Sequence, residues 1–468
     1  MPLIAAAVAE VTGGDLVAGD GARRFDGVTI DSRRVRTGQL FIGIRGDRFD
    51  GSVYAGASLD AGATGVVVDR RTAALKELAA HPGAPVVVAV DDTTDALQRL
   101  GRHVRRAAGT KVTAITGSAG KTTTKEVAAA FLGARYSVYR NPGNLNNHIG
   151  LPLSLIELRS RPAMAVVELG MNHPGEIRRL VSLAEPEMRV WTNVGDAHLG
   201  FFASPDAIAD AKAEILQRAS AATLLVCNAD DPRVMARARG FVGRIVTFGT
   251  VEGATVRATA TEDRGVDGMR ARVATPAGEH DLETPLLGRG NLANVLAATA
   301  VAIESGIPLD VIASLTPRLR PADRRGAVSR LPGGITLIDD SYNSSPTALR
   351  RALDVVAHES RCERKVAVLG EMLELGDHAL ALHRECGRAA RAAGLTALFA
   401  IGGAPARALA EAAIDAGMSA DSVTWFEQSA NAVAPISAYV RRGDLILVKG
   451  SRGTRTDIVA DRLAAEFA

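Results

Sequence analysis

The sequence is poor in aromatic residues and in cysteine, and its opposite charges nearly cancel. Phe, Trp and Tyr make up 4% of the 468 residues, so aliphatic side chains must fill most of the hydrophobic cores. The 55 basic and 52 acidic residues leave a net charge of +3, which gives no argument for a nucleic-acid partner. The three cysteines, Cys227, Cys362 and Cys386, are odd in number and far apart, which predicts buried, reduced thiols.

Long hydrophobic runs are missing as well. No stretch approaches the ~20 apolar residues that a membrane-spanning helix needs. Residues 1–14 do not place a basic segment before a long apolar core, as a secretion signal would. We therefore expect a cytoplasmic protein with no membrane span. The absence of a coiled-coil pattern favours a monomer.

Strand-like and helix-like segments alternate along the chain. At roughly 150 residues per domain, the length predicts about three domains. The predicted fold class is α/β, with a small N-terminal α/β domain (1–108), a central domain with a parallel sheet and a phosphate loop (109–320), and a C-terminal Rossmann-like domain (321–468). The expected strands are 66–68, 86–90, 111–115, 163–168, 189–194, 223–228, 335–338, 365–369, 397–401 and 445–448, the expected helices are 94–107, 205–219 and 291–305, and 244–287 should form an antiparallel appendage.

A glycine-containing loop between a strand and a helix is the most informative motif. It reads Gly117-Ser118-Ala119-Gly120-Lys121-Thr122-Thr123. Backbone N–H groups in such a loop converge on phosphate oxygens, and the helix N-terminus adds partial positive charge. Lys121 is placed to reach the β- and γ-phosphates, and the Thr122 hydroxyl to bind Mg²⁺. The general pattern has another glycine where this chain has Ile115, so the loop is a shortened variant; the alternative is a turn that only caps a helix.

Three further residues are candidates for a metal site. Glu168 ends a predicted strand, where a carboxylate faces the ligand-binding edge of a parallel sheet. His198 follows another strand end, although a lone histidine is more often a surface or capping residue. Lys212 lies on the predicted helix that follows, where a lysine is most often solvated.

Four segments together resemble the Mur ligases, the enzymes that add amino acids to the peptidoglycan precursor. They are Gly143-Asn144-Leu-Asn146-Asn147-His-Ile-Gly150, Glu168-Leu-Gly-Met-Asn-His-Pro-Gly-Glu176, Asp339-Asp340-Ser-Tyr342-Asn343-Ser-Ser-Pro346 and Leu447-Val-Lys449-Gly-Ser451-Arg452. Within the family they are similar to the members that join D-alanyl-D-alanine to UDP-N-acetylmuramoyl-tripeptide. The likeness extends from Asp31 to Arg452, and the order and combination of the motifs are its most specific feature.

The resemblance implies roles at the phosphate site. Glu168 and His198 match residues that help to hold Mg²⁺, with two ions expected, and Lys212 matches a lysine that carbon dioxide can carbamylate. Such a change turns a cation into an anion able to bind a second Mg²⁺. Lys121 and Thr122 complete this set, and ATP is the implied nucleotide. Asn291, Asn294, Arg325 and Asp340 match family positions near the nucleotide, with helix capping, surface polarity or a basic linker as the plain alternatives. Because this chain has Arg324-Arg325 where the family has Gly-Arg, the identity of the nucleotide-contacting arginine stays open.

The resemblance also implies substrate-binding residues. They are Ser32, Arg33 and Asp50 in the first domain, Asn144, Asn146 and Asn147 in the central domain, and Asn343, Lys449, Ser451 and Arg452 in the third. Without it, the first-domain segments 31–33 and 46–51 would be interpreted as a turn and a solvated loop. Lys449, Ser451 and Arg452 would lie near either the incoming dipeptide or the nucleotide.

Three other functions compete with this one. A sibling ligase would add a single amino acid, but the Asp-Asn-Pro-Arg type of motif is missing here. A phosphate-loop switch protein would hydrolyse nucleotide slowly without a peptide substrate, and a ligase-like scaffold would have lost catalysis. The set Glu168, His198 and Lys212 disfavours the switch, and retention of Lys121 and Thr122 disfavours the scaffold. The third residue of the tripeptide cannot be predicted.

Overall fold

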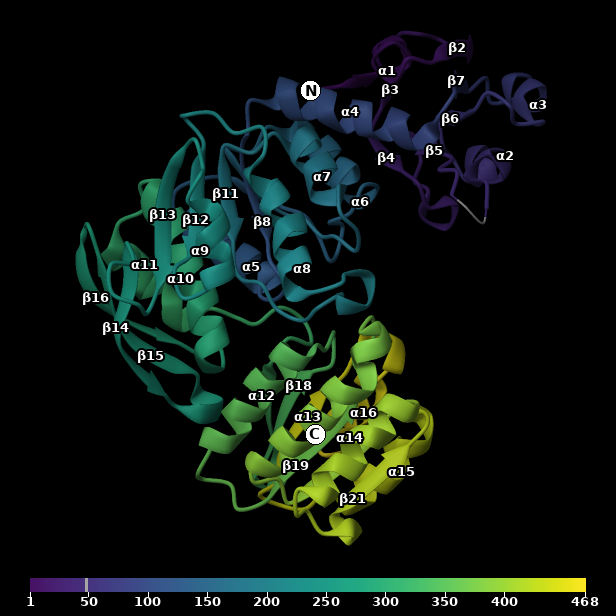
Figure 1. The fold of residues 1–468 in the computed structure, drawn as a ribbon. Coiled ribbons are helices and arrows are strands. Elements are labelled where there is room, and N and C mark those ends of the chain that lie inside the picture. The colour runs from purple at the N-terminus through teal and green to yellow at the C-terminus, as the bar shows by residue number, and fades with distance from the viewer. Residues whose placement is uncertain (47–48) are drawn as a thin grey trace. The chain divides into compact units, whose positions relative to one another are not determined.

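The computed structural model describes residues 1–46 and 49–468, which divide into two compact units. The first unit comprises Met1–Ala114, Tyr136–Met171 and Gly175–Met188, and the second comprises Ile115–Arg135, Asn172–Pro174 and Arg189–Ala468. The chain therefore passes between the units several times. Figure 1 gives the labels of the helices and strands.

The first unit contains a sheet with the strand order β2-β7-β6-β5-β4 and the small pair β1-β3. Its elements are β1 (Leu3–Ile4), α1 (Ala5–Thr12), β2 (Asp15–Ala18), β3 (Arg24–Phe25), β4 (Gly27–Thr29), β5 (Gln39–Ile42), α2 (Ala55–Asp60), β6 (Gly65–Asp69), α3 (Leu75–Ala79), β7 (Val86–Val90), α4 (Thr93–Ala108), β9 (Val138–Arg140), α6 (Gly150–Ile156), β10 (Met164–Glu168) and α7 (Glu176–Ala184). Strands β4, β5, β6 and β7 are parallel, and β2 pairs antiparallel with β7. The carboxyl ends of four strands thus lie along one edge, where ligands bind in open α/β sheets.

Two strands run from one unit into the other. They are β8 (Lys111–Thr116) and β11 (Met188–Trp191). In the first unit the order β8-β10-β9 continues the predicted parallel pattern, with β10 and β9 parallel.

The second unit holds two sheets. The elements of the first part are α5 (Lys121–Leu132), α8 (Pro205–Ala213), β12 (Leu224–Asn228), α9 (Pro232–Ala238), β13 (Arg244–Gly249), β14 (Val256–Asp263), β15 (Met269–Thr275), β16 (Gly278–Thr284), α10 (Gly288–Glu304) and α11 (Leu309–Leu315). Their strand order is β16-β15-β14-β13-β12-β11-β8. Strands β12, β13 and β14 are parallel, and only β14-β15-β16 are antiparallel. The predicted antiparallel appendage is therefore correct for its second half and wrong for β13.

The Rossmann-like sheet has the order β17-β18-β22-β19-β20-β21, parallel except for β17. Its elements are β17 (Ala327–Leu331), β18 (Ile335–Asp340), α12 (Pro346–His358), β19 (Lys365–Gly370), α13 (Ala379–Ala392), β20 (Ala397–Ile401), α14 (Ala404–Asp415), β21 (Val423–Phe426), α15 (Ser429–Tyr439), β22 (Leu445–Lys449) and α16 (Asp457–Glu466). Helices α12, α13 and α14 pack in succession, and α15 packs against α16 (Figure 1). Two groups of helices on one parallel sheet match the doubly wound prediction.

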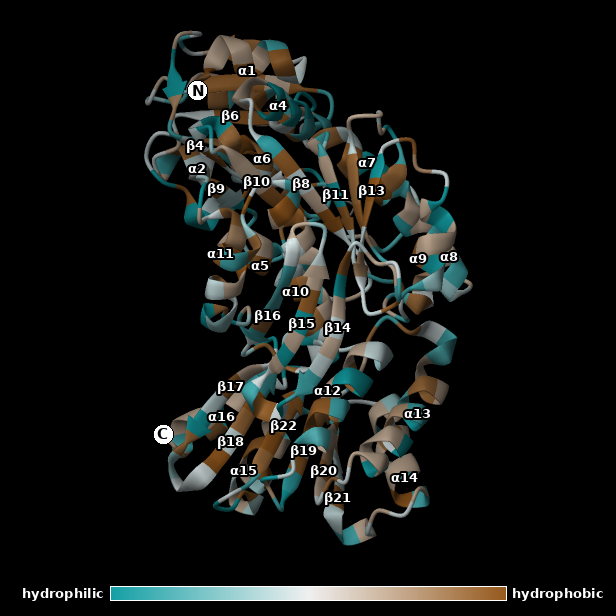
Figure 2. Cartoon of the chain, turned by 90° about the vertical axis from the view of Figure 1, so that its left-hand side faces the viewer, coloured by the Kyte–Doolittle hydropathy of each residue, from teal (hydrophilic) through white to brown (hydrophobic). Residues whose placement is uncertain are grey.

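Aliphatic residues form the cores, as the scarcity of aromatics predicts. Val366, Val368, Ile446 and Val448 lie at the centre of the Rossmann-like core and are fully or almost fully buried. Figure 2 shows the hydrophobic strands of this sheet in brown. Buried on both faces, they appear in the sequence as continuous apolar runs, which is why they could be predicted.

The thiol prediction is only partly correct. Cys227 and Cys386 are buried, and burial raises the pKa of each thiol to about 12. Cys362 is half-buried instead, because it follows the end of α12 in a polar turn. In the described part of the chain, no helix is long and apolar enough to cross a membrane.

Most predicted boundaries differ by one to three residues from those in the structure, and two of the differences have a clear cause. The strand expected over 189–194 ends at Trp191, since Thr192 and Asn193 turn to contact the phosphate loop. The helix expected over 205–219 ends at Ala213 and continues as a 3₁₀ turn, Glu214–Leu216.

Candidate nucleotide and ligase site

The phosphate loop joins β8 to α5 through two glycines with positive φ. Gly117 has φ +150° and Gly120 has φ +84°, and a Cβ atom at Gly117 would lie 1.9 Å from Thr192 Oγ1. Both positions therefore exclude a side chain. Lys121 begins α5, and its Nζ donates a hydrogen bond to the Gly117 carbonyl at 2.7 Å. The amino group is thus folded back over the loop, where a phosphate-binding lysine is needed.

Residues after β11 fix the shape of this loop. Asn193 accepts a hydrogen bond from Ala119 N at 2.9 Å and donates one to Ala119 O at 2.9 Å. Thr192 Oγ1 donates to the same carbonyl at 2.8 Å, and Ser118 Oγ exchanges hydrogen bonds with the backbone of Gly195. Thr192 and Asn193 were not among the predicted site residues, and the signal that could have found them is a polar pair directly after a buried strand.

Thr122 and Thr123 occupy the first turn of α5, and α10 supports that turn from the side. Thr124 Oγ1 donates to Asn294 Oδ1 at 3.3 Å, and Asn294 Nδ2 donates to Asn291 Oδ1 at 3.1 Å. Asn294 is 6% exposed, so it is not a surface residue. Asn294 therefore lies beside the phosphate loop, whereas Asn291 accepts from Asn294 and donates to the Leu287 carbonyl at the start of its own helix.

Lys212 is not solvated, unlike most helix lysines. It is 1% exposed, on α8. Burial, reinforced by the charge of Lys121, lowers the pKa of Lys212 well below its usual value. A neutral amine in this position is the species that can add carbon dioxide.

His198 lies in a left-handed backbone conformation after β11, with φ +67°. Its Nδ1 is 2.6 Å from Oε2 of Glu374, and the Gly200 N–H donates to the Glu374 carbonyl at 2.8 Å. The hydrogen bond from His198 lowers the pKa of Glu374. Sequence reasoning missed Glu374, because nothing in the chain order links residues so far apart.

Glu168 ends β10 in the first unit and is 2% exposed. Its backbone N–H donates to Asn141 Oδ1 at 3.0 Å. The predicted carboxylate at the end of a parallel strand is therefore present. Among the described residues, no three His, Cys, Asp or Glu side chains gather as a preformed metal cluster.

The predicted residues of the C-terminal domain gather at the ends of β18 and β22. Lys449 Nζ donates to Asp340 Oδ2 at 2.6 Å and to the Asn343 carbonyl at 3.0 Å. Ser451 Oγ accepts a hydrogen bond from Leu373 N at 3.0 Å. Asp340 and Lys449, the last residues of two neighbouring parallel strands, thus form one polar group with the carbonyl of Asn343.

The two adjacent arginines have different surroundings. Arg324 Nη2 contacts both carboxylate oxygens of Asp461 at 3.0 Å. Arg325 instead lies over the ring of Tyr342, 4.2 Å from its centroid, and Arg452 lies 6.0 Å from the same centroid. Arg324 is therefore paired with Asp461 of α16, whereas Arg325 and Arg452 both lie near the ring of Tyr342, two residues after Asp340.

In the first unit, the predicted residues Ser32, Arg33 and Asp50 follow strand ends or belong to short turns. Arg33 forms a two-pronged pair with Asp31 at 2.9 and 3.0 Å, which lowers the pKa of Asp31. Asp50 caps the 3₁₀ turn Gly51–Tyr54 by accepting from Ser52 N at 2.9 Å. Asp47 and Arg48, from the same predicted segment, lie outside the described residues.

The asparagine segment shapes the start of α6. Asn147 Oδ1 accepts from the backbone N–H groups of Ile149 and Gly150, and the Asn146 carbonyl accepts from Gly170 N at 2.8 Å. Asn144 is exposed, and its carbonyl accepts from Asn146 N at 2.7 Å. These contacts are structural, and they hold the segment beside the end of β10.

Three family models match most of the chain. The Mur ligase family catalytic domain matches residues 24–105, the Mur ligase middle domain 115–302, and the Mur ligase glutamate ligase domain 324–452. The UDP-N-acetylmuramoyl-tripeptide–D-alanyl-D-alanine ligase of Bacillus subtilis is 33% identical over 93% of this chain and 92% of its own length. The chain belongs to the Mur ligase family. This Mur ligase is an ATP-dependent ligase that forms a peptide bond in peptidoglycan precursor synthesis.

Other relatives agree with this membership. The Escherichia coli protein with the same name as the Bacillus one is 35% identical over 81% of each chain. Among solved structures, MurF from Acinetobacter baumannii has a TM-score of 0.88 at 29% identity and covers 99% of both chains. MurF ligase from Thermotoga maritima, solved in complex with ADP, has a TM-score of 0.80 at 26% identity and covers 97% of this Mur ligase and 99% of its own chain. These likenesses confirm the predicted α/β fold with three domains.

Proposed function

We propose that this Mur ligase joins D-alanyl-D-alanine to UDP-N-acetylmuramoyl-tripeptide, giving the pentapeptide precursor. The observation that carries the proposal is Lys121 folded back over the phosphate loop, with the buried Lys212 close enough for the charge of Lys121 to contribute to lowering its pKa. This arrangement suits transfer of a γ-phosphoryl group to a carboxylate. The substrates are those in the names of the relatives, which span nearly the whole chain.

The chemistry needs an activated acid, because a carboxylate alone has too poor a leaving group to acylate an amine. The terminal carboxylate oxygen of the tripeptide attacks the γ-phosphorus of ATP, and ADP leaves. The D-alanyl-D-alanine amine then attacks the carbonyl carbon of the acyl phosphate, loses a proton, and expels phosphate. Lys121 and Arg325 stabilise the charge on the transferring group, and a closed site keeps water from the acyl phosphate.

Mg²⁺ fits the donor chemistry of the proposed ligands. The Thr122 hydroxyl and the Glu168 carboxylate are hard oxygen donors, and Mg²⁺ usually combines one or two such groups with phosphates and waters. His198 would help to hold the ion, and a carbamate on Lys212 would add an anionic oxygen for a second ion. When bound, the metal would neutralise charge on the phosphates.

The remaining assignments extend the same proposal. Residues 1–108 would bind the UDP-linked precursor, 109–320 ATP, and 321–468 would supply Arg325, Asp340 and Asn343, with Lys449, Ser451 and Arg452 beside them. Asn291 and Asn294 would lie near the adenine. The reaction would take place in the cytoplasm, and the protein would act as a monomer.

The test is phosphate release with ATP, Mg²⁺, UDP-muramoyl-tripeptide and D-alanyl-D-alanine, omitting one component at a time. Release that requires all four, with a pentapeptide product identified by mass, is the expected result. Equal release without either peptide would contradict the proposal and favour the switch protein. Release with a single amino acid instead of the dipeptide would favour a sibling ligase, and no release at all a scaffold.

A further inference from the structure

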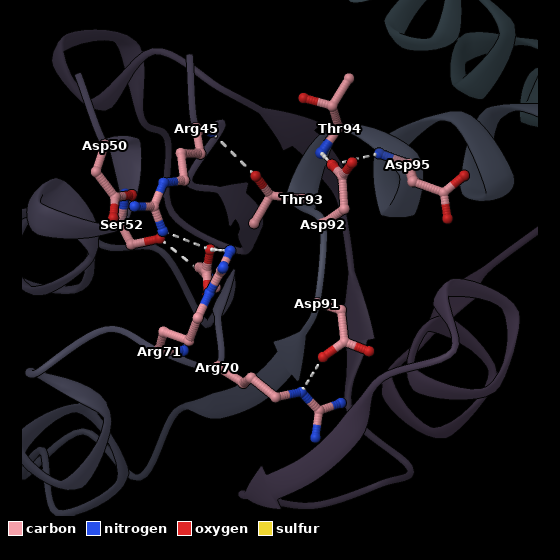
Figure 3. Close-up of polar contacts among 11 residues, drawn as sticks. Arg45, Asp50, Ser52, Arg70, Arg71, Asp91, Asp92, Thr93, Thr94 and Asp95 are labelled. Atoms are coloured by element: carbon pink, nitrogen blue, oxygen red, sulfur yellow. Dashed lines mark hydrogen bonds and ion pairs between the residues drawn. The ribbon is translucent and has the colours of Figure 1, made fainter. Parts of the chain in front are cut away.

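The carboxyl edge of the first-unit sheet carries a group of arginines arranged around one buried carboxylate. Asp69, the last residue of β6, has a side chain that is 2% exposed. It accepts hydrogen bonds from Arg71 Nε and Nη2 at 2.9 and 2.7 Å, and from Arg45 Nη1 at 2.9 Å. In Figure 3 the labelled side chains of Arg45 and Arg71 point toward each other.

Asp69 is itself held rigidly by its neighbours. Its backbone N–H donates to Ser52 Oγ at 3.1 Å, and its Oδ1 also accepts from the Arg71 N–H at 2.9 Å. Arg45 is fixed at its other end, because its backbone N–H donates to Thr93 Oγ1 at 3.0 Å (Figure 3). These hydrogen bonds thereby connect the segments that follow β5, β6 and β7.

The arginines keep donors for a ligand. A guanidinium has five N–H donors, and Asp69 takes one from Arg45. The side chains of Arg45 and Arg71 are 49% and 68% exposed. One carboxylate between two guanidinium groups leaves an excess of one positive charge.

Neighbouring acids also act on this group, because the hydrogen bond from Arg71 to Asp69 and, less strongly, the charges of Asp91 and Asp50 raise the pKa of Arg71. Asp91 pairs with Arg70 at 2.5 Å, Asp92 caps α4, and Asp50 caps the turn at Gly51. What this edge offers an anion is therefore its oriented guanidinium N–H donors rather than a large excess of positive charge. Guanidinium groups bind phosphate oxygens with two parallel hydrogen bonds when their orientation is fixed beforehand.

We propose that Asp69 is a positioning residue, which orients Arg45 and Arg71 to bind the diphosphate of the UDP-linked substrate at the carboxyl edge of the first-unit sheet. This inference rests on the proposed function, since it assumes a UDP-linked substrate. Asp69 would not touch the ligand. Its effect would pass through the two arginines, and it would affect UDP binding but not ATP binding.

The experiment measures the dissociation constants of UDP and ATP, by titration calorimetry, for the full chain and its variants. We expect Asp69→Asn to weaken UDP binding by roughly tenfold or more while ATP binding stays within about twofold. The matched control is Asp444→Asn, because Asp444 is a fully buried carboxylate paired with Arg364 at 2.7 Å in the Rossmann-like sheet. That variant should lose comparable stability and keep its UDP affinity.

A second set of variants separates positioning from general destabilisation. In an Arg45→Ala, Arg71→Ala background, adding Asp69→Asn should cost no further UDP affinity, and the salt dependence of UDP binding should be shallower than in the wild type. Should Asp69→Asn fail to fold, Arg71→Lys decides the question, since it keeps the charge and loses the two-pronged pair. Unchanged UDP affinity in Arg71→Lys and Arg45→Ala would then overturn the inference.

Three outcomes are kept apart by this design. Wild-type protein that binds no UDP would contradict the proposed function itself. UDP binding that is equal in wild type and Asp69→Asn would overturn only the inference. If UDP binding were unchanged and only UDP-muramoyl-tripeptide binding fell, the arginines would be binding peptide carboxylates, and the diphosphate assignment would be wrong.

Discussion

His198 Nδ1 lies 2.6 Å from Glu374 Oε2, which joins a loop of the nucleotide-binding region to a loop of the Rossmann-like domain. A carboxylate that accepts from one ring nitrogen fixes the orientation of the imidazole and leaves the other nitrogen toward a ligand. Glu374 also has positive φ, at +65°, and receives the Gly200 N–H. The contact between His198 and Glu374 therefore forms between two loops, each with a residue of positive φ at the contact.

We expect Glu374→Gln to raise the Mg²⁺ concentration needed for half-maximal activity by about tenfold. The loss of a hydrogen-bond partner of a metal-binding histidine has an effect of this size in other metal sites. The measurement is the initial rate as a function of Mg²⁺ concentration. Glu411→Gln is the control, because Glu411 is an exposed partner of Arg407 on α14. Identical Mg²⁺ curves for Glu374→Gln and wild type would show that the contact has no part in catalysis.

Lys212 should depend on carbon dioxide for its role. Burial, reinforced by the charge of Lys121, lowers the pKa of Lys212, which favours the neutral amine, the form that can react to give a carbamate. We expect activity to fall several-fold in carbon dioxide-free buffer and to return when bicarbonate is added. A Lys212→Met variant should be inactive and indifferent to bicarbonate. Full wild-type activity without carbon dioxide would argue for an unmodified lysine.

Gly120 should be intolerant of any side chain. A Cβ there would lie 2.1 Å from Asn294 Oδ1, and φ is +84°. We expect Gly120→Ala to lower stability by about 2–4 kcal/mol and to abolish ATP binding. Adding Asn294→Ala removes the clash but not the backbone strain, so thermal denaturation should show a partial recovery. No recovery would mean that strain alone accounts for the loss.

The two adjacent arginines should differ in function. Arg325→Ala should lower kcat by about 100-fold, because the residue lies beside Tyr342 and the proposed nucleotide contacts. Arg324→Ala should mainly lower the melting temperature by a few degrees, since it loses the pair with Asp461. Steady-state kinetics together with a melting curve for each variant checks both expectations. The reverse assignment would follow if Arg324→Ala lost the activity instead.

The contacts of Glu359 with Arg361 and Val266, in the second unit, should be sensitive to acid. The hydrogen bonds from Arg361 lower the pKa of Glu359 from 4.5 to about 2. The carboxylate also accepts from Val266 N at 3.2 Å. Because the folded-state pKa is lowered, this contribution is complete above pH 4.5 and is lost as pH falls toward 2. We expect it to be on the order of 1–3 kcal/mol at pH 7.

The check on Glu359 compares wild type with Glu359→Gln in urea denaturation at several pH values. The difference between their midpoints should be largest near pH 7 and should shrink below pH 4.5. Glu427→Gln is the control, because Glu427 is an exposed carboxylate outside this contact. A difference that does not change with pH would show that the charge of Glu359 contributes nothing.

The sequence predicted those features that local pattern determines. Buried parallel strands such as Val86–Val90 and Ala397–Ile401 are found with the predicted bounds, because continuous apolar runs mark strands covered on both faces. The phosphate loop was predicted because Gly117, Gly120 and Lys121 are fixed in spacing by the turn itself. The strand over 189–194 was overextended, since the β-branched residues Thr192 and Val194 favour a strand when only the local sequence is considered.

Contacts between distant segments could not be predicted. Nothing local distinguishes Asp69 from any other aspartate after a strand, and its role emerges only when Arg45 and Arg71 are seen to converge on it. Lys212 was selected by family resemblance alone, since a lysine in a mixed helix carries no sign of burial. Glu374 was missed because its partner, His198, lies far away in the sequence. The predicted roles of the site residues and the predicted domain bounds stay predictions.

The bond between Lys449 and Asp340 has a consequence for inherited variation. Lys449 is 3% exposed, so removing the carboxylate at 340 would leave a buried ammonium without its counter-charge. A population under selection by an inhibitor that contacts Asp340 would then rarely escape by one substitution there. Escape would require positions 340 and 449 to change together, and resistance at this place should therefore arise slowly.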